Sequence, residues 1–309
     1  MSGFLGSGDM YVDRLADDGT SSGFVLAGNA TQFAIQEETE TKERISTGRE
    51  TYGQALDTAS IKKPAKISIT MDEINKENLA MALLGDVEDL SQGSGTDEVE
   101  TVIAKAGKFA QLAKSNLAEA NFKVENKDGA TATAWEASTV YALNAFIIPT
   151  AANQHFYKCT TAGTSEATEP TWTMDGSTVT DGSAVWTDMG LILYPVTTDY
   201  TISHRLGLLQ ILSTGSITDG TNLQVTYDYN AISGSKINGS VKPTVKTRLL
   251  LDGKNAANGK SVMVRVDEAV LSPSGEVDFL SDDWTTLEME GTLKTLTGKT
   301  SPYTVELLD

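Results

Sequence analysis

The chain has 309 residues, with 42 Asp and Glu against 24 Lys and Arg, a net charge of −18, two His and one Cys. One cysteine excludes an intramolecular disulfide and a cysteine-clustered zinc site, and the acidic balance excludes wrapping of nucleic acid by clustered basic side chains. With 39% hydrophobic and 21% charged residues, we expect a globular protein with one large core or two smaller ones.

Targeting signals are not evident in the sequence. Residues 1–6 lack the basic and apolar regions of a signal peptide, and the apolar run at 141–148 is far shorter than the ~18 residues that a membrane span needs. We therefore expect a protein made in a reducing cytoplasm, without contact with a membrane.

The sequence predicts a mainly β fold. Apolar and polar residues alternate in four segments, which is typical of strands with one buried face. These segments are 66–71, 223–230, 262–267 and 287–290. Short turn signals separate the strands: 18–19, 219–220, 252–253 and 274–275.

One helix is expected, at 75–85. Asn75 can cap its first turn, Glu77 suits the positive end of the helix dipole, and Gly85 can close it. Leucines and alanines spaced four apart give it one apolar stripe: Leu79 with Leu83, and Ala80 with Leu84. A single amphipathic helix among strands predicts a sheet with the helix packed on one side.

The composition changes at about residue 131 and changes back at about 190. Between these points Lys158 is the only basic residue, 13 of 60 residues are Thr, and three of the four tryptophans occur. This difference predicts a small β module inserted into a larger domain made of 1–130 and 191–309. The insert interrupts a hairpin turn, where insertions are tolerated, so we expect it to fold by itself.

The outer segments resemble the major tail tube protein of long-tailed bacteriophages. The resemblance lies in an ordered set of features rather than in one motif: 28–35, Ser46, Gly53, Asp57, Thr58, 66–71, 75–85, 199–202, 217–220, 225–227 and 249–255. It implies a tail-tube-type β-sandwich or open barrel with one packed helix.

The resemblance also implies a structural role in the virion. Six subunits would close into a ring, and rings would stack into a hollow tube through which DNA passes during ejection without specific binding. Assembly would take place in the host cytoplasm, with other tail proteins (tape measure, tail terminator and distal tail protein) as partners. An acidic channel suits such a conduit because it repels phosphate.

Two sets of residues are candidates for roles in this tube. The polar stretch from Ser46 to Lys62 holds few apolar side chains and is longer than an ordinary hairpin loop, which indicates a functional loop. By the resemblance it would reach the adjacent ring, through residues that include Ser46, Gly53, Asp57 and Lys62. Candidate lumen-lining residues are Gln36, Glu38 and Glu40, on the polar faces of the strands around 32–40.

The insert resembles small aromatic β modules of phage structural proteins, which are similar to chitin-binding-type carbohydrate modules. A bulky module would block the channel or the stacking of rings, so we expect it to project outward from the tube. Its aromatic residues have two interpretations, the core of a mini-domain or a surface that makes weak glycan contact: Trp135, Tyr141, Trp172 and Trp186. The second leads to the alternative function, a soluble carbohydrate-binding or adhesion protein.

The sequence offers no convergent catalytic site, so we predict neither an enzyme nor a cofactor or metal. Glu37, Glu38 and Glu40 are expected to form a charged surface, and Asp282-Asp283 an exposed turn. Cys159 is expected to be buried and unreactive because the insert lacks cationic neighbours. His155 and His204 have no evident acidic companion in the sequence.

Overall fold

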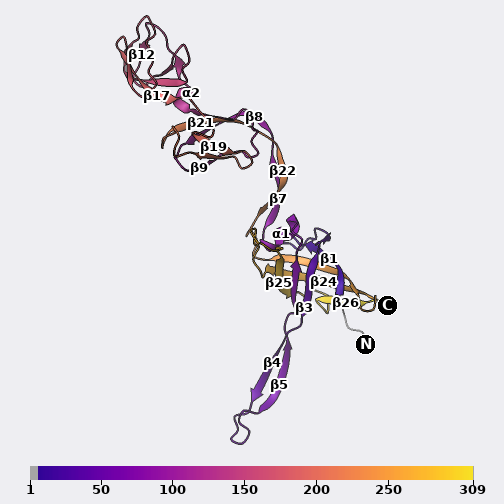
Figure 1. The fold of residues 1–309 in the computed structure, drawn as a ribbon. Helices are drawn as coiled ribbons and strands as arrows, with labels where there is room; N and C mark the ends of the chain where they lie inside the picture. Colours follow the sequence, from indigo (N-terminus) through magenta and orange to yellow (C-terminus); the bar gives the residue numbers. More distant parts are fainter. Residues whose placement is uncertain (1–5, 309) are drawn as a thin grey trace. The chain divides into compact units, whose positions relative to one another are not determined.

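The computed structural model describes residues 6–308. The first five residues, where the sequence predicts no leader, lie outside this range. The chain divides into two compact units: unit 1 is Met1–Asp89 with Ser235–Asp309, and unit 2 is Leu90–Gly234. As the sequence predicts, the protein is mainly β (Figure 1).

Unit 1 is built on an eight-stranded antiparallel sheet with the order β2-β1-β23-β24-β25-β6-β3, in which β26 also pairs with β24. The elements of unit 1 are β1 (Gly6–Arg14), β2 (Val25–Leu26), β3 (Ala30–Gln36), β4 (Thr39–Ile45), β5 (Ala55–Lys62), β6 (Lys66–Met71), α1 (Lys76–Ala82), β23 (Val245–Asn255), β24 (Ser261–Pro273), β25 (Leu287–Leu293) and β26 (Tyr303–Leu307). Among residues 6–308 the sheet order is an open path, and no barrel closes.

Strand β24 holds two different neighbours on one side. Its first half, Val262 to Val266, pairs with β26, and its second half, Ala269 to Pro273, pairs with β25. Along its other side it pairs with β23 over almost its whole length. The alternating apolar residues of these strands form one core with β6 and α1, which includes Met10, Ile67, Leu271 and Met289.

Helix α1 begins as the sequence predicts. The Asn75 side chain accepts the backbone N–H of Asn78 at 2.8 Å, which satisfies one of the free donors of the first turn. Its end differs from the prediction, because Leu84 and not Gly85 takes the left-handed conformation (φ +50°). Gly85 is required there for a close approach, since a Cβ would lie 2.6 Å from the carbonyl oxygen of Asn238.

One predicted turn is wrong. Asp252 and Gly253 lie inside β23, where Gly253 faces Gly8 of β1 across the ladder. The two strands approach closely at this point, because a Cβ on Gly8 would lie 2.4 Å from the carbonyl oxygen of Asp252. The glycine signal therefore reflects a close backbone approach rather than a change of chain direction.

The chain passes between the two units through a ribbon of two paired strands, β7 (Asp86–Gln92) and β22 (Ile232–Asn238). Unit 2 contains β8 (Gly95–Ile103), β9 (Phe109–Gln111), β10 (Lys123–Asn126), α2 (Lys127–Ala130), β11 (Thr133–Ala134), β12 (Val140–Tyr141), β13 (Phe146–Ile148), β14 (His155–Thr161), β15 (Gly163–Thr164), β16 (Thr178–Asp181), β17 (Ala184–Leu191), β18 (Leu193–Tyr194), β19 (Tyr200–Ser203), β20 (Leu208–Ile211) and β21 (Asn222–Tyr229). Sheets β18-β10-β21-β8 and β19-β20-β9 enclose a core that includes Leu209, Val225 and Tyr227.

The insert has its own sheet, β11-β13-β14-β17-β16, and its own apolar core. Unit 2 nevertheless groups the insert with 90–130 and 191–234, two segments that the sequence analysis assigned to the outer domain. The pairing of β10 with β18 and β21 explains this grouping, since it fastens both ends of the insert to the same sheet. The chain therefore has three apolar cores, whereas its composition suggests one outer domain and one insert.

Candidate functional site

The segment predicted to be a long polar loop is half strand. Residues 55–62 form β5, which pairs with β4 from Thr39–Lys62 to Ile45–Ala55, and only 46–54 form the connection. Figure 1 shows this hairpin continuing beyond β3 as a separate two-stranded ribbon. All eight residues of β5 are exposed, and so are most of β4. Both faces of this strand carry polar side chains. The sequence therefore lacks the apolar–polar alternation from which a strand is predicted.

The hairpin carries the residues expected to contact an adjacent ring. Ser46 and Gly53 lie in its connection, where the Gly53 N–H donates to the carbonyl oxygen of Ser46 (3.0 Å). Asp57 and Lys62 lie on β5, and Asp57 pairs with Arg44 at 3.0 Å on the exposed surface. Apolar side chains are exposed as well, among them Ile45, Tyr52 and Leu56. A free two-stranded hairpin is marginally stable in water, so this ribbon is a surface that a neighbour would stabilise.

The candidate lumen residues lie where β3 passes into β4. Gln36 is exposed at the end of β3, whereas Glu38 and Glu40 are each paired with a lysine. The pairs are Glu38 with Lys66 (2.8 Å), Glu40 with Lys63 (3.5 Å) and also Glu37 with Lys62 (3.6 Å). The hydrogen bond that the Lys66 ammonium donates to the Glu38 carboxylate raises the pKa of Lys66, so this lysine stays charged. This surface is therefore close to neutral, and the carboxylates do not form a convergent site.

The sheet in unit 1 has three end strands, β2, β3 and β26. Among the strands that the structure describes, β3 pairs only with β6 and β26 only with β24. The Tyr303 hydroxyl donates to Glu37 at 2.9 Å and links the two edges at one point. Unpaired N–H and C=O groups along such edges can accept a strand from another chain.

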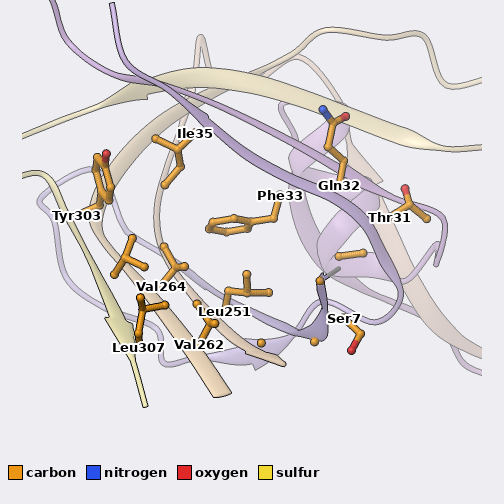
Figure 2. Close-up of a pocket in the computed structure, with 15 residues that line it drawn as sticks. Ser7, Thr31, Gln32, Phe33, Ile35, Leu251, Val262, Val264, Tyr303 and Leu307 are labelled. Carbon is orange, nitrogen blue, oxygen red and sulfur yellow. The ribbon is translucent and has the colours of Figure 1, made fainter. Parts of the chain in front are cut away.

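An apolar pocket of about 570 Å³ lies between these edges. Figure 2 shows Phe33 at its centre, near Leu251, Val262 and Val264. At its rim Leu307 is 76% exposed, so the pocket opens to solvent. Its volume is that of a site for a ligand or an anchoring side chain, and an apolar hollow of this kind indicates an interaction surface.

The aromatic residues of the insert face inward. Trp135, Tyr141 and Trp186 are 7%, 8% and 0% exposed, and Trp172 is half-buried against them. The Tyr141 and Trp186 rings meet edge to face with centroids 4.8 Å apart. Since buried rings cannot offer a face to a sugar, these side chains act as the core of the insert.

Two buried carboxylates, which sequence reasoning missed, organise this core. Asp181 accepts hydrogen bonds from the indole N–H groups of Trp135 (2.8 Å) and Trp186 (3.2 Å) and from the backbone N–H of Glu166. Asp188 contacts His155 at 2.8 Å, so this histidine has the acidic companion that the sequence does not reveal. Asp181 directly precedes Gly182, a sequence typical of a turn, so the sequence gives no sign that its carboxylate is a buried acceptor.

No group of three or more His, Cys, Asp or Glu within 6–308 is arranged to hold a metal ion. Cys159 is buried, as predicted, and burial raises the pKa of its thiol, which disfavours the reactive thiolate. Asp282 and Asp283 are exposed in the connection between β24 and β25. Neither helix in the described part of the chain combines the length and apolar character needed to cross a membrane.

A family model for proteins of unknown function matches residues 3–163 and 178–303, which is well over half of the chain. The two matched ranges include most of the insert, and the unmatched stretch, 164–177, lies inside it. No curated protein matches the chain.

Proposed function

This chain belongs to the family described as "Protein of unknown function UCP028589", and we propose that it is a structural subunit of the tail tube of a long-tailed bacteriophage. The subunits form hexameric rings, and the rings stack into a hollow tube that conducts DNA during ejection. Tape measure, tail terminator and distal tail proteins are its partners in the virion. The proposal combines the resemblance of the sequence with the assembly surfaces of unit 1.

The β4–β5 hairpin is the observation that carries the proposal. Its strands pair only with each other among the described residues, and all of β5 is exposed. An extended ribbon without a core has little stability of its own, and a contact with a neighbouring subunit supplies what it lacks. The open edges of β3 and β26 support the same conclusion, because edges that are a liability in a monomer become contacts in an assembly.

The charge of the channel follows from the ion pairs described above. Because Glu38 and Glu40 are paired with Lys66 and Lys63, the segment around Gln36 gives the lumen a nearly neutral lining. A neutral or acidic lining keeps DNA from adhering, as a conduit requires. The carbohydrate-binding alternative needs exposed aromatic faces, and the burial of Trp135 and Trp186 does not support it.

Shortening the hairpin tests this proposal. Lys42 faces Ala59 in the ladder, so replacing 43–58 by Asn-Gly keeps the register and closes the ribbon with a two-residue turn. We expect a folded protein, by circular dichroism and sedimentation, that forms no tubes in negative-stain electron microscopy. The matched control removes 131–190, which we expect to give thinner tubes. Normal tubes from the shortened hairpin would contradict the proposal.

A further inference from the structure

The apolar pocket of unit 1 lies on one face of four neighbouring strands. One row of the ladder lines it from side to side: Gly8 of β1, Gly253 of β23, Val262 of β24 and Leu307 of β26. The two glycines add no side chain to the floor of the pocket, so this end of the row leaves space that a close-packed core would fill. Val305 and Leu307 are 52% and 76% exposed. The core of unit 1 is therefore uncovered at this place.

Two sides of the pocket are edges of strands. Runs of consecutive residues line it, 6–8 of β1 and 30–33 of β3. Because successive side chains of a strand point to opposite faces, such a run borders the hollow with its edge. On the side of β1 away from β23, only Tyr11 and Val12 have ladder partners among the described strands. An occupant of the pocket thus meets an apolar floor and an open backbone edge.

The segment that precedes β1 has the matching chemistry. Residues 1–5 lie outside the described range, and their sequence, Met-Ser-Gly-Phe-Leu, leads directly into Gly6 at the border of the pocket. Three of these five residues are apolar, and none of the first eight residues is charged. None of the fifteen described residues that line the pocket is charged either. Transfer of apolar side chains from water into such a hollow is favourable, and no charge has to be desolvated.

The alternation of β1 selects Phe4 as the side chain that faces the pocket. Gly6 and Gly8 line the pocket, and Met10 lies in the core on the same face of the strand. Even positions therefore face the core, which assigns position 4 to the pocket face and Leu5 to the opposite face. Position 4 is about 7 Å along the chain from Gly6. Glycine at position 6 allows the chain to bend there at no steric cost, so the Phe4 ring can reach back over the two glycines.

We propose that segment 1–5 folds back over the start of β1 and seats Phe4 in the pocket of its own chain. The ring completes the core at the place where Gly8 and Gly253 leave space. A strand from another chain can enter between β1 and β3 only by displacing this segment. The pocket is separate from the β4–β5 hairpin that carries the proposed function, so either proposal can fail alone.

Dye binding tests which side chain fills the pocket. Anilinonaphthalene sulfonate fluoresces on exposed apolar surface. We compare the untagged full chain with Phe4→Ser and with the matched control Leu5→Ser, which loses an apolar side chain from the opposite face. Phe4→Ser should bind more dye than the other two proteins. The free peptide Met-Ser-Gly-Phe-Leu at about millimolar concentration should displace the extra dye, because a short tether supplies an effective concentration of this order. Equal dye binding by all three proteins would overturn the proposal.

Cross-linking tests whether the occupant comes from the same chain. Thr31 is exposed at the border of the pocket, and Figure 2 shows it with Ser7 on the side opposite Tyr303. We introduce Ser2→Cys and Thr31→Cys into the full chain, whose native Cys159 is buried. A short bis-maleimide should link the two cysteines within single chains, as mass spectrometry of the monomer band on a denaturing gel can show.

The same cysteine pair with Phe4→Ser is the control for the cross-link. It should react several times more slowly, because the segment has lost its anchor. Circular dichroism should show that this variant folds like its parent. Equal rates with and without Phe4 would show that the ring does not hold the segment and would overturn the proposal. Links between chains in place of links within chains would assign the pocket to a second copy and overturn it as well.

Discussion

The insert at 131–190 packs its large side chains on one another, whereas the β4–β5 hairpin leaves its own in solvent. Both segments extend from the sheets that hold them. The insert buries Trp186 and Tyr157 completely, and none of the eight residues of β5 is buried. The difference shows that extending from a sheet does not decide whether a segment is stable by itself. What decides it is a set of large side chains that can bury one another.

Removing the centre of the insert core should have the largest effect. Trp186→Ala deletes a fully buried ring that contacts Tyr141 and Trp172, and such deletions cost about 3–5 kcal/mol. That amount is comparable to the whole stability of a small module, so we expect the insert to unfold while unit 1 stays folded. Limited proteolysis with mass spectrometry should locate the cuts within 131–190. The control is Trp284→Ala, and an insert that resists protease would contradict the core assignment.

Removing the buried acceptor should have the next effect. Asp181→Ala leaves the indole N–H groups of Trp135 and Trp186 and the N–H of Glu166 without their acceptor. Unsatisfied buried donors cost about 1–3 kcal/mol, so the midpoint of insert unfolding in urea should fall clearly. Asp181→Asn keeps an acceptor oxygen and should lose less. Equal losses in the two variants would show that the carboxylate oxygens are not what holds the indoles.

High pH should affect the insert through its buried tyrosines. Burial raises the pKa of Tyr141 and of Tyr157 above the ordinary value of 10.0. A raised pKa in the folded state means that the stability contributed by each neutral phenol is complete below pH 10 and declines as the pH rises toward the folded-state pKa. Unfolding monitored between pH 8 and 12 should therefore show the insert weakening from about pH 10 upward. Tyr157→Phe should weaken this dependence, and an unchanged profile would argue against it.

A substitution in the hairpin should have the smallest effect on folding. Tyr52 is 79% exposed in the connection between β4 and β5. Tyr52→Ser should change the free energy of unfolding by no more than about 0.5 kcal/mol, as is usual for surface positions. Thermal unfolding of the disassembled subunit is the measurement. A loss of several degrees would mean that the hairpin contributes to the fold of unit 1 and is not a free ribbon.

The sequence predicted elements well where one face is buried. The alternation at 66–71 corresponds to β6 residue for residue, because a strand with a core on one side shows its period. The cap at Asn75 was also predictable, since it depends only on neighbouring residues. The hairpin was missed because both of its faces are polar, which removes the period.

The site was less predictable because its features depend on residues far apart in the chain. Asp181 is ordinary in the sequence and becomes an acceptor only when Trp135, 46 positions earlier, folds onto it. The pocket joins β3 to β26, two strands at opposite ends of the sequence, and no local pattern marks that meeting. The grouping of 90–130 with the insert likewise follows from long-range pairing between β10 and β21.

The double pairing of β24 restricts how this protein can change in length. A residue inserted near the middle of β24 would move Val270 and Leu271 each to the face of the sheet that it does not occupy now. The ladders with β23 and β25 would both lose register. An insertion in 46–54 or 274–286 disturbs no ladder. Insertions that lengthen or decorate the subunit are therefore tolerated in the connections between strands. The length of β24 is fixed, because both of its ladders depend on it.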